Sequence, residues 1–331
     1  MLDSPQTRLL AVLKTGQVHI MQADTPSSPV LATALMIGAM AIIGVIDNVV
    51  ILLAETVGLW QFHMMRALLM LPLIAGLSAL GFGTLRPKRL GVVAVRSLLI
   101  TMAMLFYFAS LSLMPIAQAL AGLFTSPIFV LLISSLALRK KIGPWRILAV
   151  LLGFSGILCV LQPNPDTFDA LTLLPVAGGF FYALSSIITR SHCAQESTVA
   201  LLACMVVTLG LAGAVGLVAL GLSPMATAAG PEGFVTRGWV TDVSPAAIWI
   251  VIQAVGSTVA VFMLIKSYQV GEPSYVAVFE YSVMIFGPLF AWIALGQVLG
   301  SVQILGIALI AIAGALLGWR ARHAPMEQQV T

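Results

Sequence analysis

The sequence predicts an all-α integral membrane protein with ten transmembrane helices, from its composition, its long apolar runs and the placement of its basic residues. The chain has 331 residues, of which 60% are hydrophobic and 8% are charged. Soluble globular chains have about 45–50% apolar and about 25% charged residues. This composition excludes a soluble globule.

Ten runs of the chain are long enough to cross a bilayer. A spanning helix needs about 20 mostly apolar residues to cross about 30 Å of hydrocarbon. Bounded by charges, Pro or Gly clusters, the runs cover residues 30–54, 59–82, 90–112, 115–137, 145–162, 170–190, 198–221, 245–268, 273–295 and 300–319. The first run exceeds the about 7–15 residues of a signal-peptide core. We therefore expect it to be a retained first span.

The basic residues orient these spans, because cytoplasmic loops retain Lys and Arg while exported loops do not. With ten spans and a cytoplasmic N-terminus, the outer loops hold only Arg237, and Arg66 and Arg96 lie inside spans. All the others fall on the cytoplasmic side: Arg8, Lys14, Arg86, Lys88, Arg89, Arg139, Lys140, Lys141, Arg146, Arg190, Lys266, Arg320 and Arg322. The pattern predicts ten spans with both termini in the cytoplasm.

The connections between the spans are short, with one exception. The links at Met114–Pro115 and Gly296–Gly300 are tight enough to require antiparallel neighbours. The exception is the external loop 222–244, which is rich in Gly, Pro, Ala and Thr and contains Trp239. We interpret it as a solvated connector, with a lid over an outward mouth as the alternative.

A weak internal repeat divides the chain into two halves. At an offset of 158 residues, the stretch from Pro115 aligns with the stretch from Pro273, and Gly156 aligns with Gly314. Five spans is an odd number, so the second copy must be inverted, as in alternating-access transporters. We expect a polar cytoplasmic segment at 1–29, a first repeat at 30–163, a second repeat at 170–320 and a cytoplasmic tail at 321–331.

Several short motifs follow one another in a recognisable order. They are Arg96-Ser-Leu-Leu, Phe106-Tyr-Phe-Ala, Met114-Pro-Ile-Ala-Gln-Ala, Ser126-Pro-Ile-Phe-Val, Ile142-Gly-Pro-Trp-Arg and Gly153-Phe-Ser-Gly, with Phe279-Glu-Tyr-Ser and Ala294-Leu-Gly-Gln in the second half. Over about 290 residues the chain resembles the EamA-type members of the drug/metabolite transporter superfamily. The resemblance implies two inverted five-span repeats and a carrier in the inner cell membrane.

A smaller set of residues resembles one subgroup of that family, which includes proposed uptake carriers for S-adenosylmethionine and riboflavin. The matching residues are Asp47-Asn48, Trp60-Gln61 and Arg66. The chain departs from the subgroup at three positions, where Ile51 replaces a Lys and Gln118 and Lys140 replace acids. Any substrate handling by those three groups would have to differ in this protein.

Four charged residues lie within the spans, where a charge near the membrane centre costs about 2.5–3.5 kcal/mol on insertion scales. Asp47 and Arg66 share the outer half, while Arg96 and Glu280 share the inner half. Matched depth predicts two charge pairs. They are either structural ion pairs or gating pairs that exchange partners at opposite ends of a central cavity.

Polar and aromatic residues cluster near the predicted midplane. The candidate substrate-binding residues are Glu280, Tyr281, Tyr182, Ser126, Thr125 and Gln253. Kinks at Pro127 and Pro288 free backbone carbonyls nearby. The set suits a cavity for a small ligand with a planar or cationic part, and a generic aromatic core is the equal alternative.

These features favour a secondary carrier for a small polar metabolite, coupled to protons or working as an exchanger. No phosphate-binding loop, nucleophile elbow or metal-binding motif occurs in the sequence, so we expect no ATP hydrolysis, enzyme activity, metal or cofactor. A channel or scaffold is the alternative, followed by a membrane-embedded enzyme. The expected partners are the substrate, the lipid bilayer and a coupling proton, without nucleic acid. Small residues at helical spacing allow a monomer or a homodimer.

Overall fold

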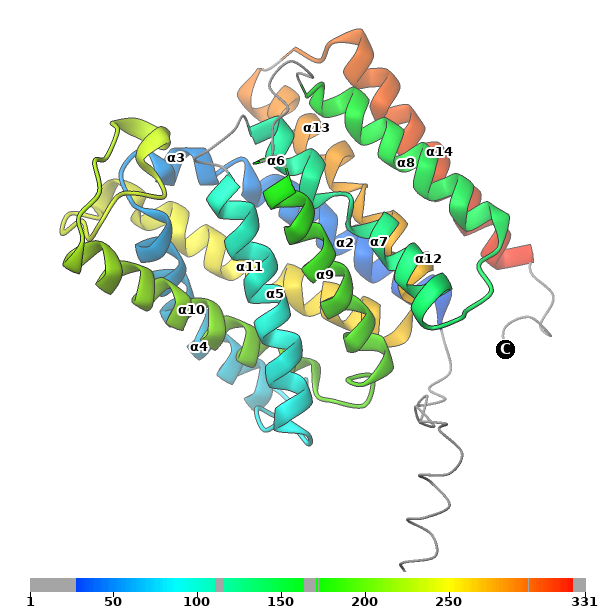
Figure 1. Ribbon diagram of the computed structural model, residues 1–331, viewed down its shortest axis with the longest axis horizontal. Coiled ribbons are helices and arrows are strands. Elements are labelled where there is room, and N and C mark those ends of the chain that lie inside the picture. Colours follow the sequence, from blue (N-terminus) through cyan, green and yellow to red (C-terminus); the bar gives the residue numbers. More distant parts are fainter. Residues whose placement is uncertain (1–27, 111–115, 164–170, 172, 297, 324–331) are drawn as a thin grey trace, which may run out of the picture.

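The computed structural model describes residues 28–110, 116–163, 171, 173–296 and 298–323, and the regular structure in these ranges is helical, without strands (Figure 1). Ten helical stretches in this part of the chain are long and apolar enough to cross a membrane. Their bounds agree with the predicted runs to within a few residues. The prediction of an all-α fold with ten candidate spans is confirmed.

Each half of the chain supplies five spans. The first half contains α2 (Pro29–Asp47) with α3 (Val50–Ala54), α4 (Leu59–Ala79), α5 (Leu90–Ser110), α6 (Ile116–Leu123) with α7 (Ser126–Leu132) and the π-helix η1 (Ile133–Ala137), and α8 (Pro144–Leu161). The second half contains α9 (Leu173–Ser191), α10 (Thr198–Leu222), α11 (Ser244–Val270), α12 (Pro273–Glu280) with α13 (Val283–Leu295), and α14 (Ser301–His323).

The helices pair between the two halves. Helix α4 packs along α10 and α8 packs along α14, while α2 packs along α11 and α5 along α9 (Figure 1). If the first span is treated as equivalent to the sixth, and so on to the fifth and tenth, the pairs α4–α10 and α8–α14 each map onto themselves. The pairs α2–α11 and α5–α9 map onto each other. Two copies of one structural repeat would produce this pattern.

Two spans in corresponding positions of the halves are broken near their middle. The break between α6 and α7 falls at Phe124–Thr125, and the break between α12 and α13 falls at Tyr281–Ser282. At each break a backbone hydrogen bond joins residues that are three apart instead of the four of an α-helix. Thr125 N donates to Gly122 O at 3.2 Å, and Tyr281 N donates to Val278 O at 3.3 Å. Broken helices in matching positions are where transporters commonly build their binding sites.

The loop between α10 and α11 folds into a cap over the end of α3 and the start of α4. We call residues 230–240 the outer cap, because this end is the predicted external one. Trp60 Nε1 donates to Val235 O at 2.9 Å, and the Gln61 amide donates to Val240 O at 2.7 Å and accepts from Val240 N at 2.8 Å. The guanidinium of Arg237 donates to Ala54 O at 2.6 Å.

These bonds change the interpretation of the loop as a solvated connector. Phe234, from the middle of the outer cap, is only 5% exposed and packs in an apolar cluster with residues of α3, α4 and α11. Trp239 remains 59% exposed. The connector is therefore solvated at its rim and packed at its centre, because Phe234 buries apolar surface against the helix ends.

Candidate functional site

Glu280 lies at the C-terminal end of α12, directly before the break in the ninth span. Its carboxylate is 3% exposed, and its Oε1 accepts hydrogen bonds from Tyr182 Oη of α9 at 2.8 Å and from Tyr268 Oη of α11 at 2.6 Å. Three helices thus meet at one buried carboxyl group. The sequence placed Glu280 and Tyr182 at similar depth, and the structure brings them into direct contact.

Tyr268 was absent from the predicted set. It lies at the inner end of the eighth span, so depth alone placed it nearer the membrane surface than Glu280. A tyrosine side chain is long, and this one is 1% exposed and extends back into the bundle to reach the carboxylate. The sequence did contain a signal for this contact. Tyr268 lies on the neighbouring eighth span, and its side chain is long enough to reach the buried Glu280.

The short helix α12 that holds Glu280 is wholly interior. All eight of its residues are buried. Pro273 begins it, where a missing N–H costs nothing, and the hydroxyl of Ser282 donates to Phe279 O at 2.7 Å beyond its end. Helix start and break are therefore both satisfied locally, which fixes the position of the carboxylate.

Tyr281 follows Glu280 but does not join its hydrogen bonds. Its ring packs edge-on against Phe124, with ring centroids 6.4 Å apart, and against Gly153 of α8. A Cβ at position 153 would overlap the Tyr281 ring, so only glycine fits there. The buried Tyr281 hydroxyl has no hydrogen-bond partner among the described residues.

Arg96 of α5 is the second buried charge of the inner half, at 3% exposed. Its Nε donates to Thr189 Oγ1 of α9 at 3.1 Å, while its Nη1 has no hydrogen-bond partner in the described part of the chain. No ion pair joins Arg96 to Glu280 there. The electrostatic influence of both charges reaches Tyr182. Their pairing at matched depth stays a prediction for another conformation.

Asp47 and Arg66 are likewise not in direct contact within the described ranges. Asp47 is exposed at the end of α2, yet the groups that act on it, Arg66 and Gln253, come from α4 and α11. The carboxylate therefore faces a space between helices. Arg66 Nη2 contacts His63 Nδ1 at 3.4 Å, and its guanidinium lies 5.0 Å from the centre of the Phe62 ring.

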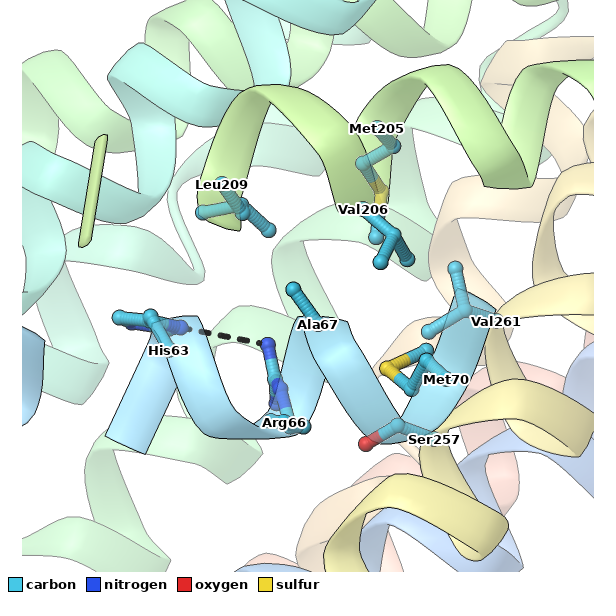
Figure 2. A pocket seen from close by; sticks show the side chains of 9 residues that line it. All are labelled: His63, Arg66, Ala67, Met70, Met205, Val206, Leu209, Ser257 and Val261. Atoms are coloured by element: carbon cyan, nitrogen blue, oxygen red, sulfur yellow. Dashed lines mark hydrogen bonds between the residues drawn. The ribbon is translucent and has the colours of Figure 1, made fainter. Parts of the chain in front are cut away.

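Figure 2 shows a small cavity beside Arg66, between α4, α10 and α11. Its volume is about 30 Å³, which is room for about one water molecule. The lining residues are His63, Arg66, Ala67, Met70, Met205, Val206, Leu209, Ser257 and Val261. The cavity is too small for a metabolite and separate from the residues that bond Glu280.

The other predicted binding residues make local or structural contacts. Gln253 Nε2 donates to Ile46 O at 2.6 Å, which ties α11 to the end of α2. Thr125 Oγ1 donates to Gly122 O at 2.6 Å within its own span, and Ser126 is buried beside it. None of these three contacts the Glu280 carboxylate. Their role in substrate binding stays a prediction.

Aromatic rings lie next to Tyr182 along α5 and α9. Phe106 and Phe181 are stacked, with centroids 5.6 Å apart and planes within 4° of parallel. Phe180 meets Phe181 edge-on at 5.8 Å. The stacked pair offers flat apolar faces at the position on α9 that directly precedes Tyr182.

Residues 30–162 match the EamA-like transporter family. The match covers the first five of the ten predicted spans. It is 27% identical over 285 residues to the riboflavin transporter of Vibrio cholerae, covering 84% of this chain and 87% of that protein. It is 28% identical over 122 residues to the S-adenosylmethionine uptake transporter of Rickettsia bellii, covering 37% of this chain and 42% of that protein.

A protein of known crystal structure shares the fold of this chain. The two align with a TM-score of 0.69 over 87% of this chain and 98% of the other, at 17% sequence identity. The match to the EamA-like family, the transporter relatives and the ten apolar helices support a multi-pass protein of the inner membrane. The resemblance to the riboflavin and S-adenosylmethionine subgroup is confirmed.

Proposed function

We propose that the protein is a secondary carrier that moves a small polar metabolite across the inner membrane by alternating access. The observation that carries this proposal is the buried Glu280 carboxyl at the break of the ninth span, held by two neutral phenols. Such a group is costly in a membrane and usually serves a pathway for substrate or protons. The relation to a riboflavin transporter over 84% of the chain supports transport as the role.

In this proposal Glu280 contacts the substrate, the coupling proton or both in turn. Its second carboxylate oxygen leaves acceptor capacity beyond the two phenol bonds to Oε1. The stacked Phe106 and Phe181 next to Tyr182 supply faces for a planar ring. A metabolite with a flat heterocycle and polar hydrogen-bond donors suits both features. Riboflavin and S-adenosylmethionine are the first compounds to test.

Alternating access would be produced by the two halves moving as inverted repeats. The exchange of helix pairs between the halves and the matching breaks in the fourth and ninth spans support this. In the same scheme Asp47 and Arg66 serve the outer end of the pathway, and Arg96 and Glu280 serve the inner end. Both termini would lie in the cytoplasm.

Purified protein reconstituted into vesicles tests the carrier proposal. We expect riboflavin or S-adenosylmethionine uptake that saturates with concentration and speeds up when the same compound is preloaded inside, because a carrier must return between turnovers. A channel would show neither behaviour. Uptake that is linear with concentration and insensitive to preloading would refute the carrier mechanism.

Cysteine labelling in whole cells tests the orientation. We expect a cysteine at Lys141 to be protected from an impermeant maleimide and a cysteine at Trp239 to react. Native Cys193 is fully buried beyond the end of α9, and burial raises the pKa of its thiol to about 11, so it should contribute little background. Labelling at position 141 from outside would contradict the ten-span orientation.

A further inference from the structure

One face of α9 carries four hydroxyl groups through the inner half of the bundle. Tyr182, Ser185, Ser186 and Thr189 follow a spacing of three and four residues, which places them on one side of a helix. Such a polar stripe is unusual in a membrane span, where hydroxyls need partners. Each of the four has one.

The stripe connects the two buried charges. Tyr182 donates to Glu280, and Ser186 bonds to Tyr268, the second phenol on that carboxylate. At the other end Thr189 accepts from Arg96 Nε, and Ser185 donates to the Arg96 carbonyl at 3.2 Å. Residues on neighbouring turns of the same face of α9 thus bond to Glu280 and to Arg96. Both of these side chains also act electrostatically on Tyr182.

Neither group has an oppositely charged partner within the described ranges. Arg96 has a hydroxyl as its side-chain partner and leaves Nη1 unsatisfied, and Glu280 has two phenols and no basic partner in the described ranges. The other groups acting on Arg96 are the Cys193 thiol, the Tyr182 phenol and the Cys204 thiol, which supply no counter-charge while protonated. A buried cation and a buried acid held apart by neutral hydroxyls would each be stabilised by direct contact.

We propose that Arg96 is the internal counter-ion of Glu280 in the empty carrier, where a direct ion pair replaces the hydrogen bond from Tyr182. The inference rests on the proposed carrier function and assigns a positioning residue to it. When substrate or a proton occupies Glu280, Arg96 returns to Thr189, as seen here. When the site empties, the pair removes the uncompensated carboxylate and lets the empty carrier reorient.

The proposal separates two modes of transport that one vesicle assay can measure. Exchange of radiolabelled riboflavin for internal riboflavin needs only the loaded carrier, whereas net uptake also needs the empty carrier to return. We expect Arg96→Gln to keep exchange within about twofold of wild type and to lose net uptake by about tenfold or more, since an unpaired buried carboxylate opposes the return step. Arg96→Lys keeps the charge and should recover most of the net uptake.

Two further variants control the interpretation. Ser97→Ala removes a buried hydroxyl from the same turn of α5 that has no hydrogen-bond partner among the described residues, and it should leave both modes unchanged. The Arg96→Gln/Glu280→Gln double variant leaves neither charge, so its net uptake should be no worse than that of Glu280→Gln alone.

Three results would overturn the proposal: equal losses of exchange and net uptake in Arg96→Gln, net uptake at the wild-type level in that variant, or additive losses in the double variant. If Arg96→Gln does not fold, the comparison of Arg96→Lys with wild type decides, and an equal loss of both modes there counts against the pairing. Wild-type vesicles that transport neither riboflavin nor S-adenosylmethionine would count against the carrier function itself.

Discussion

The broken fourth and ninth spans, α6–α7 and α12–α13, share a backbone arrangement and differ in their chemistry. In both, a backbone hydrogen bond near the middle of the span joins residues that are three apart. The first break carries Thr125 and Ser126, while the second carries Glu280 and Tyr281. The two breaks thus share a backbone arrangement, and of the two only the second carries a carboxyl group.

The difference extends to where the side chains bond. Thr125 satisfies a carbonyl of its own span, so the first break is closed locally. Glu280 bonds to α9 and α11, so the second break is held by helices from elsewhere in the bundle. A movement of α9 or α11 would therefore change the hydrogen bonds of Glu280 and leave the hydrogen bond of Thr125 unchanged. In the proposed carrier cycle, the ninth span would therefore respond to movements of those two helices.

Replacing the carboxylate with an amide should have the largest effect. Glu280→Gln keeps the shape and can still accept from Tyr182 and Tyr268, so we expect it to fold and reach the membrane. Without an ionisable group it should lose coupled uptake by about a hundredfold, as general acid–base groups contribute about 10²–10⁴-fold where protons move. Exchange should persist if Glu280 carries only the proton.

Vesicle uptake with and without a pH gradient measures this effect. Wild-type uptake with wild-type pH dependence in a well-folded Glu280→Gln protein would remove Glu280 from the mechanism and with it the contrast between the two breaks.

The sequence predicted how deep a residue lies along its span better than which direction that face of the helix points. Hydropathy and charge fixed ten spans, and counting residues along each span placed Glu280 and Tyr182 at matching depth. Depth does not say which way a helix faces, so the direction of Tyr281 toward α8 and the reach of Tyr268 could not be predicted. These depend on how α8 and α11 turn about their own axes, which packing at residues such as Gly153 determines.

The outer cap was missed for a related reason. Its composition of Gly, Pro, Ala and Thr is typical of a solvated loop. The bonds that fold it come from Trp60 and Gln61 at the start of α4, far away in the sequence. A single sequence carries no signal that pairs these two segments.

Removing one phenol from Glu280 should have an intermediate effect. Tyr268→Phe deletes the 2.6 Å hydrogen bond while keeping the ring. The loss should be about 1.5–3 kcal/mol of stability if the carboxyl group is charged and about 0.5–1.5 kcal/mol if it is neutral. Thermal unfolding in detergent, compared with wild type, therefore also reports the state of Glu280.

Tyr281→Phe is the matched control, because the hydroxyl that it removes has no partner among the described residues. We expect no loss of stability, and a gain of up to about 1 kcal/mol, since an unsatisfied buried group is removed. An equal loss in the two phenylalanine variants would show that the phenol bonds to Glu280 have no special weight.

The smallest effect should come from the first break. Thr125→Val keeps the shape of the side chain, which packs closely against Gly179 of α9, and deletes only the bond to Gly122 O. We expect a loss of about 0.5–1.5 kcal/mol in thermal stability, the range for one neutral hydrogen bond. The KM for the transported compound should change by less than about threefold, because the one donor of this hydroxyl is already used within its own helix. A large rise in KM with normal stability would instead place Thr125 among the substrate contacts, as its depth in the membrane predicts, and the two breaks would then share the binding work.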